Sequence, residues 1–307
     1  MAAPPLTGRS RVAVLLLVVV TATWGSTFFL IRDLVRTVPP VDFLAVRFTL
    51  AAIGMFIVFR RQALRLSRRE LRIGVVLGLL YGVAQIMQTV GLAHTSASVS
   101  GFITGTYVVF TPLLGAWLFK DRITPVMWVA VLMTTVGLGI LSLRGFSVGI
   151  GEGLTLVAAV VYALHILALS RWSSVDAAVG LAVVQSGVIA LLCLIAALPG
   201  GITLPSSPGG WTSMLYMAFV AGAFTLWAQT WAQAHLSATR TALVMALEPV
   251  FAAFFAVLFG GESLTSRMLV GGGLVVAAMY LVELRGHPPG DALASEEPPS
   301  EIRHHDV

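Results

Sequence analysis

The most constraining feature of this sequence is the length of its stretches without charged residues. From Ala177 to Thr239 the chain contains no Asp, Glu, Lys or Arg, whereas a helix that crosses a bilayer needs only about 20 apolar residues. The Pro-, Gly- and Ser-rich segment Pro199–Gly210 divides this stretch, which is too long for one helix. The stretch therefore predicts two membrane-spanning helices.

Eight further spans are predicted from the rest of the chain. Five of them are uninterrupted charge-free runs: Val12–Ile31, Ile73–Ala93, Thr95–Phe119, Ile123–Leu143 and Gly153–Ser170. Three contain charges and are predicted from their apolar pattern, at about 41–59, 241–261 and 268–284. We therefore expect an all-α integral membrane protein with ten transmembrane helices.

Composition excludes several classes of protein. Hydrophobic residues make up 57% of the 307 residues and charged residues 11%, with a mean hydropathy of +0.92. Soluble proteins carry about 25% charged residues, so an ordinary soluble enzyme is excluded. Ten spans and their loops also leave no room for a nucleotide-binding domain, which excludes an ATP-driven pump. The single cysteine, Cys193, cannot form an internal disulfide, and no cofactor or metal is expected.

The arginine and lysine residues predict an orientation, because short cytoplasmic loops are enriched in both. With the N-terminus inside, fourteen of the nineteen lie on the inner side, four lie outside, and Arg47 lies within a span. Both termini are therefore expected in the cytoplasm of a cell, with residues 1–11 as an N-terminal segment and 286–307 as a disordered tail. The positions of the positive charges are explained by membrane topology, and the sequence contains no nucleic-acid-binding motif. We therefore expect the protein to contact lipid and not nucleic acid.

An internal repeat divides the chain into halves. The segment Ala93–Ala97 (AHTSA) recurs as Ala234–Ala238 (AHLSA), and the same register continues without a gap from Gln88 to Thr124, the counterparts of Gln229 and Thr265. Each half, 12–143 and 151–285, would then hold five spans. An odd number of spans forces the halves to enter the membrane in opposite directions. Inverted repeats of this kind are typical of secondary transporters, which bind substrate between the halves.

Several motifs resemble one family. They are Trp24-Gly25-Ser26-Thr27, Pro39-Pro40, Ala45-Val46-Arg47-Phe48, Ala246-Leu247-Glu248-Pro249-Val250-Phe251 and Gly261-Glu262-Ser263-Leu264. Together they are similar to EamA-domain members of the drug/metabolite transporter superfamily, over about residues 12–285. The resemblance implies two inverted five-helix halves around a central cavity, and export or exchange of small metabolites. The first half departs from the pattern, with Tyr107-Val108 in place of Glu-Pro and Lys120-Asp121-Arg122 where Gly-Glu-Arg is common.

Glu248 is the first candidate for transport chemistry. An ionisable group inside a span costs about 2.5–3.5 kcal/mol on insertion scales and usually faces a cavity or a partner. Glu248 could bind a proton or a substrate cation. Alternatively, it could satisfy backbone groups freed by Pro249, which lacks an N–H.

Polar residues at helical spacing predict three stripes that face one central space. The stripes are Tyr81, Gln85 and Gln88; Ser100, Thr104, Tyr107 and Thr111; and Thr241, Met245, Glu248 and Ala252. Tyr107 and Glu248 are repeat partners, so both are expected at the cavity. The alternative is that these side chains only form hydrogen bonds between helices.

Three further residues have two interpretations each. His165, one turn after Tyr162, could relay protons or could simply be satisfied by a neighbour. Trp24 could form an aromatic wall for substrate or pack in the core. Arg47 is expected to be structural, either paired with Asp42 or extended outward to the membrane surface.

The leading interpretation is a secondary transporter that moves a small metabolite or organic solute across the cell membrane by alternating access. Export is the expected direction, and proton coupling and oligomeric state remain open. An intramembrane enzyme or a passive channel is the alternative. The enzyme would need a nucleophile with a base or a metal cluster, and the sequence has neither HExxH nor a pair of intramembrane aspartates, so no enzymatic activity is expected.

Overall fold

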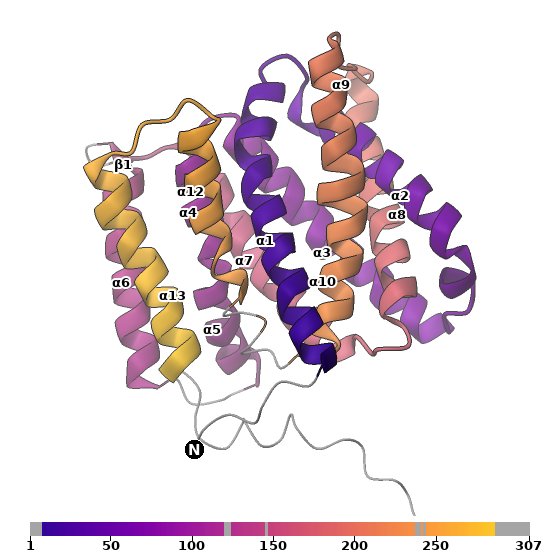
Figure 1. Cartoon of the computed structure of the whole chain (residues 1–307), viewed down its shortest axis with the longest axis horizontal. Helices are drawn as coiled ribbons and strands as arrows, with labels where there is room; N and C mark the ends of the chain where they lie inside the picture. The colour runs from indigo at the N-terminus through magenta and orange to yellow at the C-terminus, as the bar shows by residue number, and fades with distance from the viewer. Residues whose placement is uncertain (1–7, 120–123, 145–146, 237–240, 242–243, 286–307) are drawn as a thin grey trace, which may run out of the picture.

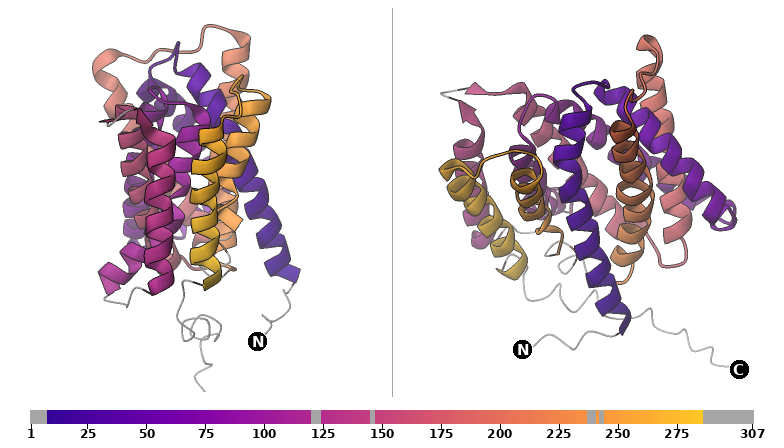
Figure 2. Two further views of the ribbon diagram at one scale, coloured as in Figure 1. Left: turned by 90° about the vertical axis from the view of Figure 1, so that its left-hand side faces the viewer. Right: turned by 45° about the horizontal axis from the view of Figure 1, so that its top comes forward.

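Figure 1 shows a computed structural model of the chain, in which residues 8–119, 124–144, 147–236, 241 and 244–285 are described. The helices stand side by side as an upright bundle, as both views in Figure 2 show. Among the described residues, seven helices are long and apolar enough to cross a membrane. They are α1 (Gly8–Leu34), α2 (Pro40–Leu64), α3 (Arg68–Leu92), α4 (Ala97–Gly105) with α5 (Tyr107–Phe119), α7 (Ile150–Trp172), α8 (Ala178–Ala197) with η1 (Leu198–Gly200), and α9 (Pro208–Leu215) with η2 (Tyr216–Phe224) and α10 (Thr225–Gln233).

Shorter apolar helices lie at the three other positions where spans are predicted. They are α6 (Pro125–Ser142), α12 (Glu248–Leu258), and η3 (Met268–Gly272) with α13 (Gly273–Arg285). Two strands of two residues each, β1 (Leu143–Arg144) and β2 (Ser147–Val148), pair antiparallel after α6. The sequence pattern does not predict them. The expected N-terminal segment up to residue 7, the segment 120–123 with Lys120-Asp121-Arg122, and the expected disordered tail lie outside the described residues.

Local sequence explains where several helices begin. Pro40, Pro125 and Pro208 stand at first helical positions, where a missing N–H removes no intrahelical bond. A capping box opens α3: the Glu70 N–H donates to Ser67 Oγ, and the Ser67 N–H donates to Glu70 Oε2 at 2.7 Å. The Ser67 hydroxyl also donates to this exposed carboxylate at 2.7 Å.

Small residues let α3 pack closely against α8. A Cβ placed on Gly74 would lie 2.8 Å from Val184 Cγ1, and one on Gly78 would lie 2.7 Å from Val188 Cβ. Gly82 continues the same ridge one turn later. Such ridges bring helix backbones together in membranes, where apolar burial gives no driving force between helices.

Two predicted spans are interrupted in the structure. The span predicted at Thr95–Phe119 breaks at Thr106, which follows the weak helix former Gly105. In the span predicted at 241–261, the described residues Thr241, Val244 and Met245 are helical, Ala246 and Leu247 form a turn, and the helix α12 begins at Glu248. Here Pro249 supplies no N–H to the carbonyl four residues earlier. The first predicted span is nonetheless long and apolar enough to cross a membrane as a whole, and each of the two contains a turn that the sequence pattern does not predict.

Candidate functional site

One cavity brings together all eight residues selected from the sequence as substrate or coupling candidates. Its lining includes Trp24, Tyr81, Gln85, Gln88, Thr104, Tyr107, His165 and Glu248, with Arg47 beside them. The cavity volume is about 40 Å³, room for a few water molecules at about 10–15 Å³ each. In this conformation the cavity is contracted, so a metabolite can enter only if helices move apart.

Glu248 and Tyr107 form a direct pair at this cavity. The Tyr107 hydroxyl donates to Glu248 Oε2 at 2.7 Å, and it also lies 3.3 Å from the Met245 carbonyl. That carbonyl is the acceptor that Pro249 leaves free, since proline has no N–H. The Tyr107 hydroxyl therefore lies close to the freed carbonyl, while its single proton goes to the shorter bond with Glu248 Oε2. A charged carboxylate only accepts hydrogen bonds, so Glu248 could donate to a backbone carbonyl only in its protonated form.

A second polar group ties three helices together across the cavity. Gln88 on α3 donates through Nε2 to Thr104 Oγ1 on α4 at 3.0 Å. Its amide oxygen accepts from the Tyr162 hydroxyl on α7 at 2.9 Å. All three side chains are buried, so these bonds satisfy polar groups that are removed from bulk water. The polar stripe on α3 therefore both lines the cavity and forms interhelical hydrogen bonds.

Aromatic rings form much of the remaining wall. The ring of Tyr81 lies 5.1 Å from that of His165 and 5.6 Å from that of Tyr162, measured between centroids. His165 Nε2 lies 2.9 Å from Gln185 Oε1; because an amide oxygen only accepts, this nitrogen is the donor. His165 is thus satisfied by a neighbour while it lines the cavity. Trp24 also lines the cavity and is satisfied by a neighbour, because its Nε1 donates to Thr225 Oγ1 of α10 at 2.9 Å.

The environment of Arg47 differs from the one predicted. Arg47 is only 2% exposed, so it does not extend to the membrane surface. It does not pair with Asp42 either, because Asp42 Oδ2 accepts from the Thr203 N–H at 3.0 Å. Both expectations for this arginine are therefore wrong.

The partners of Arg47 come from an element that is not predicted, the π-helix η2. Arg47 Nε donates to the Met217 carbonyl at 2.9 Å, and Nη2 donates to the Ala221 carbonyl at 3.0 Å. Helices with i→i+5 bonding have a shifted register, and these two carbonyls face the guanidinium. The guanidinium also lies over the ring of Phe48 at 4.9 Å. Arg47 thereby fixes α2 against η2.

The polar stripes on the interrupted spans are only partly correct. On the first, Thr104 and Tyr107 line the cavity, whereas Thr111 donates to the Tyr107 carbonyl. On the second, Ala252 packs against Gly101 instead of lining the cavity. Thr111 and Ala252 lie on the same helices as the cavity residues Tyr107 and Glu248, so the breaks do not account for these two misses.

Gln229 and Tyr162 line the cavity but are not among the candidates selected from the sequence. Gln229 is the repeat counterpart of Gln88, so the sequence repeat could have identified it as a cavity residue. The Gln229 Oε1 atom is buried and has no hydrogen-bond partner among the described residues. It therefore leaves a vacant acceptor at the cavity.

Comparison with known proteins gives consistent similarities. The EamA-like transporter family matches residues 11–143 and again residues 149–284. An uncharacterized transporter of Archaeoglobus fulgidus is 31% identical over 270 residues, covering 88% of this chain and 85% of that protein. A probable amino-acid metabolite efflux pump of Salmonella typhimurium is 26% identical, covering 87% and 93%. A solved crystal structure with 20% identity covers 90% of this chain and 98% of its own, with a TM-score of 0.64.

Proposed function

The chain belongs to the EamA-like transporter family, and from this premise we propose that it is a proton-coupled exporter of small metabolites that carry an amino group. In this proposal ten membrane spans form two inverted five-helix repeats, 12–143 and 151–285, with both termini in the cytoplasm. The cavity described above binds the substrate and opens alternately to each side of the membrane.

The positions of the two helix breaks support the inverted repeat. Thr106, at the break in the first half, has φ −63° and ψ −11°. Leu247, its counterpart in the sequence repeat, has φ −77° and ψ −17°. The next helix then starts at Tyr107 in one half and at Glu248 in the other. The two halves thus restart their helices at equivalent residues.

The packing of helices also follows a two-fold pattern. Counterpart helices pack against each other in the pairs α2 with α8, α4 with α12, and α6 with α13. Other contacts occur in matched sets: α1 with α12 corresponds to α4 with α7, and α3 with α7 corresponds to α1 with α10. A pseudo-two-fold axis between two halves produces this arrangement.

Residues that are equivalent in the sequence repeat line the cavity in pairs. Besides Tyr107 and Glu248, the lining contains the repeat partners Gln88 with Gln229 and Thr104 with Met245. A site built from equivalent positions of both halves lies where the halves meet. That is where inverted-repeat transporters bind their substrates.

The observation that carries the substrate class is an excess of acceptors at this cavity. Glu248 takes part in none of the ion pairs of the described residues, and Gln229 Oε1 has no donor there. Arg47, the other charged lining residue, already donates to carbonyls of η2. A protonated amine has three donors and is also attracted to aromatic faces such as those of Trp24 and Tyr81. The similarity to a probable amino-acid metabolite efflux pump fits this class.

Coupling follows from the presence of one carboxylate in the cavity. A charged carboxylate is costly inside a membrane, so Glu248 is best occupied by either a proton or the substrate ammonium at each stage. Proton binding then displaces the amine, and the amine displaces the proton. This competition exchanges an entering proton for a leaving substrate.

Transport in proteoliposomes tests the proposal. Purified protein is reconstituted, and uptake of a labelled amino acid is measured with and without a pH gradient, with N-acetylated and unmodified amino acids as competitors. We expect saturable, gradient-dependent uptake that unmodified amino acids inhibit and their N-acetylated forms do not. Flux that never saturates would indicate a channel. Chemical conversion of the solute would indicate an enzyme.

A further inference from the structure

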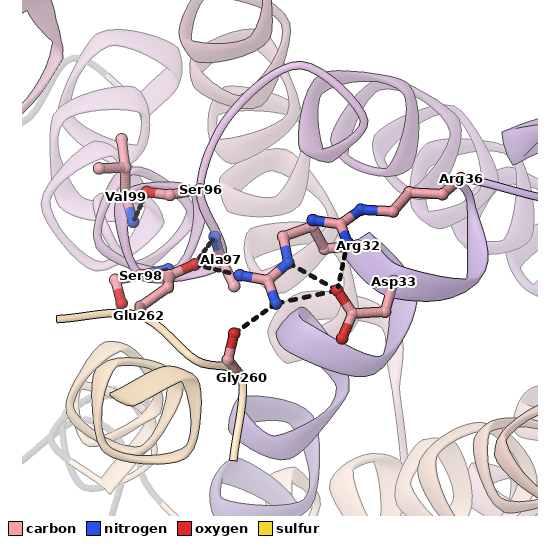
Figure 3. A network of polar contacts seen from close by, with 9 residues as sticks. All are labelled: Arg32, Asp33, Arg36, Ser96, Ala97, Ser98, Val99, Gly260 and Glu262. Atoms are coloured by element: carbon pink, nitrogen blue, oxygen red, sulfur yellow. Dashed lines mark hydrogen bonds and ion pairs between the residues drawn. The ribbon is translucent and has the colours of Figure 1, made fainter. Parts of the chain in front are cut away.

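A cluster of charged contacts joins three helix ends outside the cavity (Figure 3). Arg32, in the last turn of α1, donates through Nη1 to Glu262 Oε1 at 2.7 Å and through Nη2 to the Gly260 carbonyl at 2.6 Å. Glu262 also accepts from the first backbone N–H groups of α4, those of Ala97 at 2.7 Å and Ser98 at 3.2 Å. We call these five residues the Arg32–Glu262 clamp.

The clamp connects helices that supply the cavity lining. α1 contributes Ile31, the residue immediately before Arg32, α4 contributes Thr104, and α12, which precedes Gly260, begins at Glu248. α1 and α4 lie in the N-terminal half of the chain, and α12 lies in the C-terminal half. The clamp therefore holds the two halves together at one end of the cavity.

We propose that the Arg32–Glu262 clamp is a gate, which closes this end of the cavity and must open when the cavity faces the side of the membrane on which the clamp lies. The proposal rests on the alternating-access function proposed above. It goes beyond that function by assigning the closure to a specific ion pair. In the proposed orientation the clamp lies on the outer side, so its opening releases the exported solute.

The charges in the clamp have alternative partners, which makes opening feasible. The Arg32 and Glu262 side chains are 14% and 12% exposed, so both reach water at the edge of the bundle. Arg32 Nε donates to Asp33 Oδ1 at 2.9 Å, and this contact within α1 persists when the clamp opens. Glu262 retains its hydrogen bonds from the N–H groups at the N-terminus of α4, where a carboxylate is favoured. Opening therefore leaves neither charge unpaired, which would be the costly outcome.

The loop that carries Glu262 is built to bend. Gly261 has φ +68°, a left-handed conformation that glycine adopts without the steric cost of a Cβ. Nothing lies within 4 Å of where its Cβ would be. The Glu262 N–H donates to the Ala256 carbonyl of α12 at 3.1 Å, so Glu262 moves with the end of α12, and opening separates both from Arg32 of α1.

Accessibility of a cavity residue tests the gate without any substrate. Leu92 lines the cavity from α3, which is outside the clamp. In a Cys193→Ala background, Leu92→Cys is labelled with a membrane-impermeant maleimide added to intact cells. We expect Arg32→Gln and Glu262→Gln each to increase the labelling rate about tenfold, the population shift that corresponds to losing about 1.4 kcal/mol of charge-assisted hydrogen bonding. Arg36→Gln is the matched control, because Arg36 is exposed in the turn just after α1 and pairs only with the nearby Asp33 at 3.9 Å among the described residues.

Two outcomes would overturn the gate. One is equal labelling in the Arg32→Gln and Arg36→Gln proteins at normal abundance. The other outcome concerns Arg32→Lys, which is used if Arg32→Gln fails to accumulate. Lysine keeps the charge, but an ammonium lacks the planar fork of donors that reaches both Glu262 and Gly260. A labelling rate in Arg32→Lys equal to that of the parent protein would contradict the proposal. The gate is tested by labelling and the amine substrate by transport, so either proposal can be contradicted while the other holds.

Discussion

The Tyr107 hydroxyl lies 2.7 Å from Glu248 Oε2, and the two residues are equivalent positions of the sequence repeat. In the inverted arrangement proposed above, equivalent residues of the two halves can touch only close to the axis that relates them. This hydrogen bond therefore joins the halves where their interrupted helices restart. The pair is asymmetric, since one half supplies the acceptor and the other the donor, and a single titratable carboxylate lies at the centre.

Glu248→Gln tests whether this carboxylate couples protons to transport. Glutamine keeps the size of the side chain and an oxygen that can accept from Tyr107, but it cannot bind and release a proton. We expect normal abundance and loss of the pH dependence of transport, measured in proteoliposomes at several pH values. Glu70→Gln is the control, since Glu70 lies in the capping box that begins α3. An unchanged pH profile in Glu248→Gln would show that Glu248 is structural.

Tyr107→Phe tests the hydrogen bond itself. The substitution keeps the ring and removes the hydroxyl, so Glu248 Oε2 loses its donor and the Met245 carbonyl loses a polar neighbour at 3.3 Å. A buried acceptor without a partner costs about 1–3 kcal/mol. We expect a lower melting temperature in detergent and slower transport. Thr111→Val is the control, because its hydroxyl only bonds the carbonyl one turn earlier. Equal melting temperatures for the two variants would argue against the role of the hydroxyl.

The sequence predicts most of the cavity because charge and polarity are scarce in membrane spans. Glu248, Tyr81 and the glutamines of α3 stand out against apolar neighbours, and helical spacing puts them on common faces. Gln229 follows from the repeat in the same way. Spacing does not show where a span is interrupted, although both stripes continue across the breaks, from Thr104 to Tyr107 and from Met245 to Glu248.

The partners of Arg47 show where local pattern stops being informative. Asp42 is close in the sequence and of opposite charge, which makes it the natural candidate. The observed acceptors, Met217 and Ala221, are backbone carbonyls of a π-helix in the other half of the chain. Their availability depends on hydrogen-bond register and not on residue type. The same holds for Glu262, whose bonds to Arg32 and to the start of α4 depend on tertiary packing.

Arg47→Met tests the structural role of this arginine. Methionine fills similar space but leaves the Met217 carbonyl without its donor, at a cost of about 1–3 kcal/mol. We expect less folded protein in the membrane and a lower melting temperature, with transport per folded molecule reduced less than abundance. The melting temperature and abundance of Arg47→Lys should lie between those of the parent protein and those of Arg47→Met. Normal abundance together with abolished transport would instead assign Arg47 a direct part in transport.

Gly25→Ala tests the contact between α1 and α12. A Cβ on Gly25 would lie 2.5 Å from Phe251 Cβ and 2.8 Å from the Ala252 nitrogen, so the helices must separate. Overpacking of this kind costs about 1–3 kcal/mol, and we expect a lower melting temperature. Gly187→Ala on α8 is the matched control, because nothing lies within 4 Å of its added Cβ. It should be neutral or slightly stabilising, since alanine favours helix.

The inverted repeat makes a prediction about sidedness that needs no substrate. His94 and His235 occupy equivalent positions in the repeated segments Ala93–Ala97 and Ala234–Ala238, each just after a predicted span. If the halves are inverted, these histidines lie on opposite sides of the membrane. In the Cys193→Ala background, His94→Cys should react with an impermeant maleimide in intact cells. His235→Cys should react only in inside-out vesicles. Labelling of both from the same side would rule out the inverted arrangement and, with it, a cavity formed between two opposed halves.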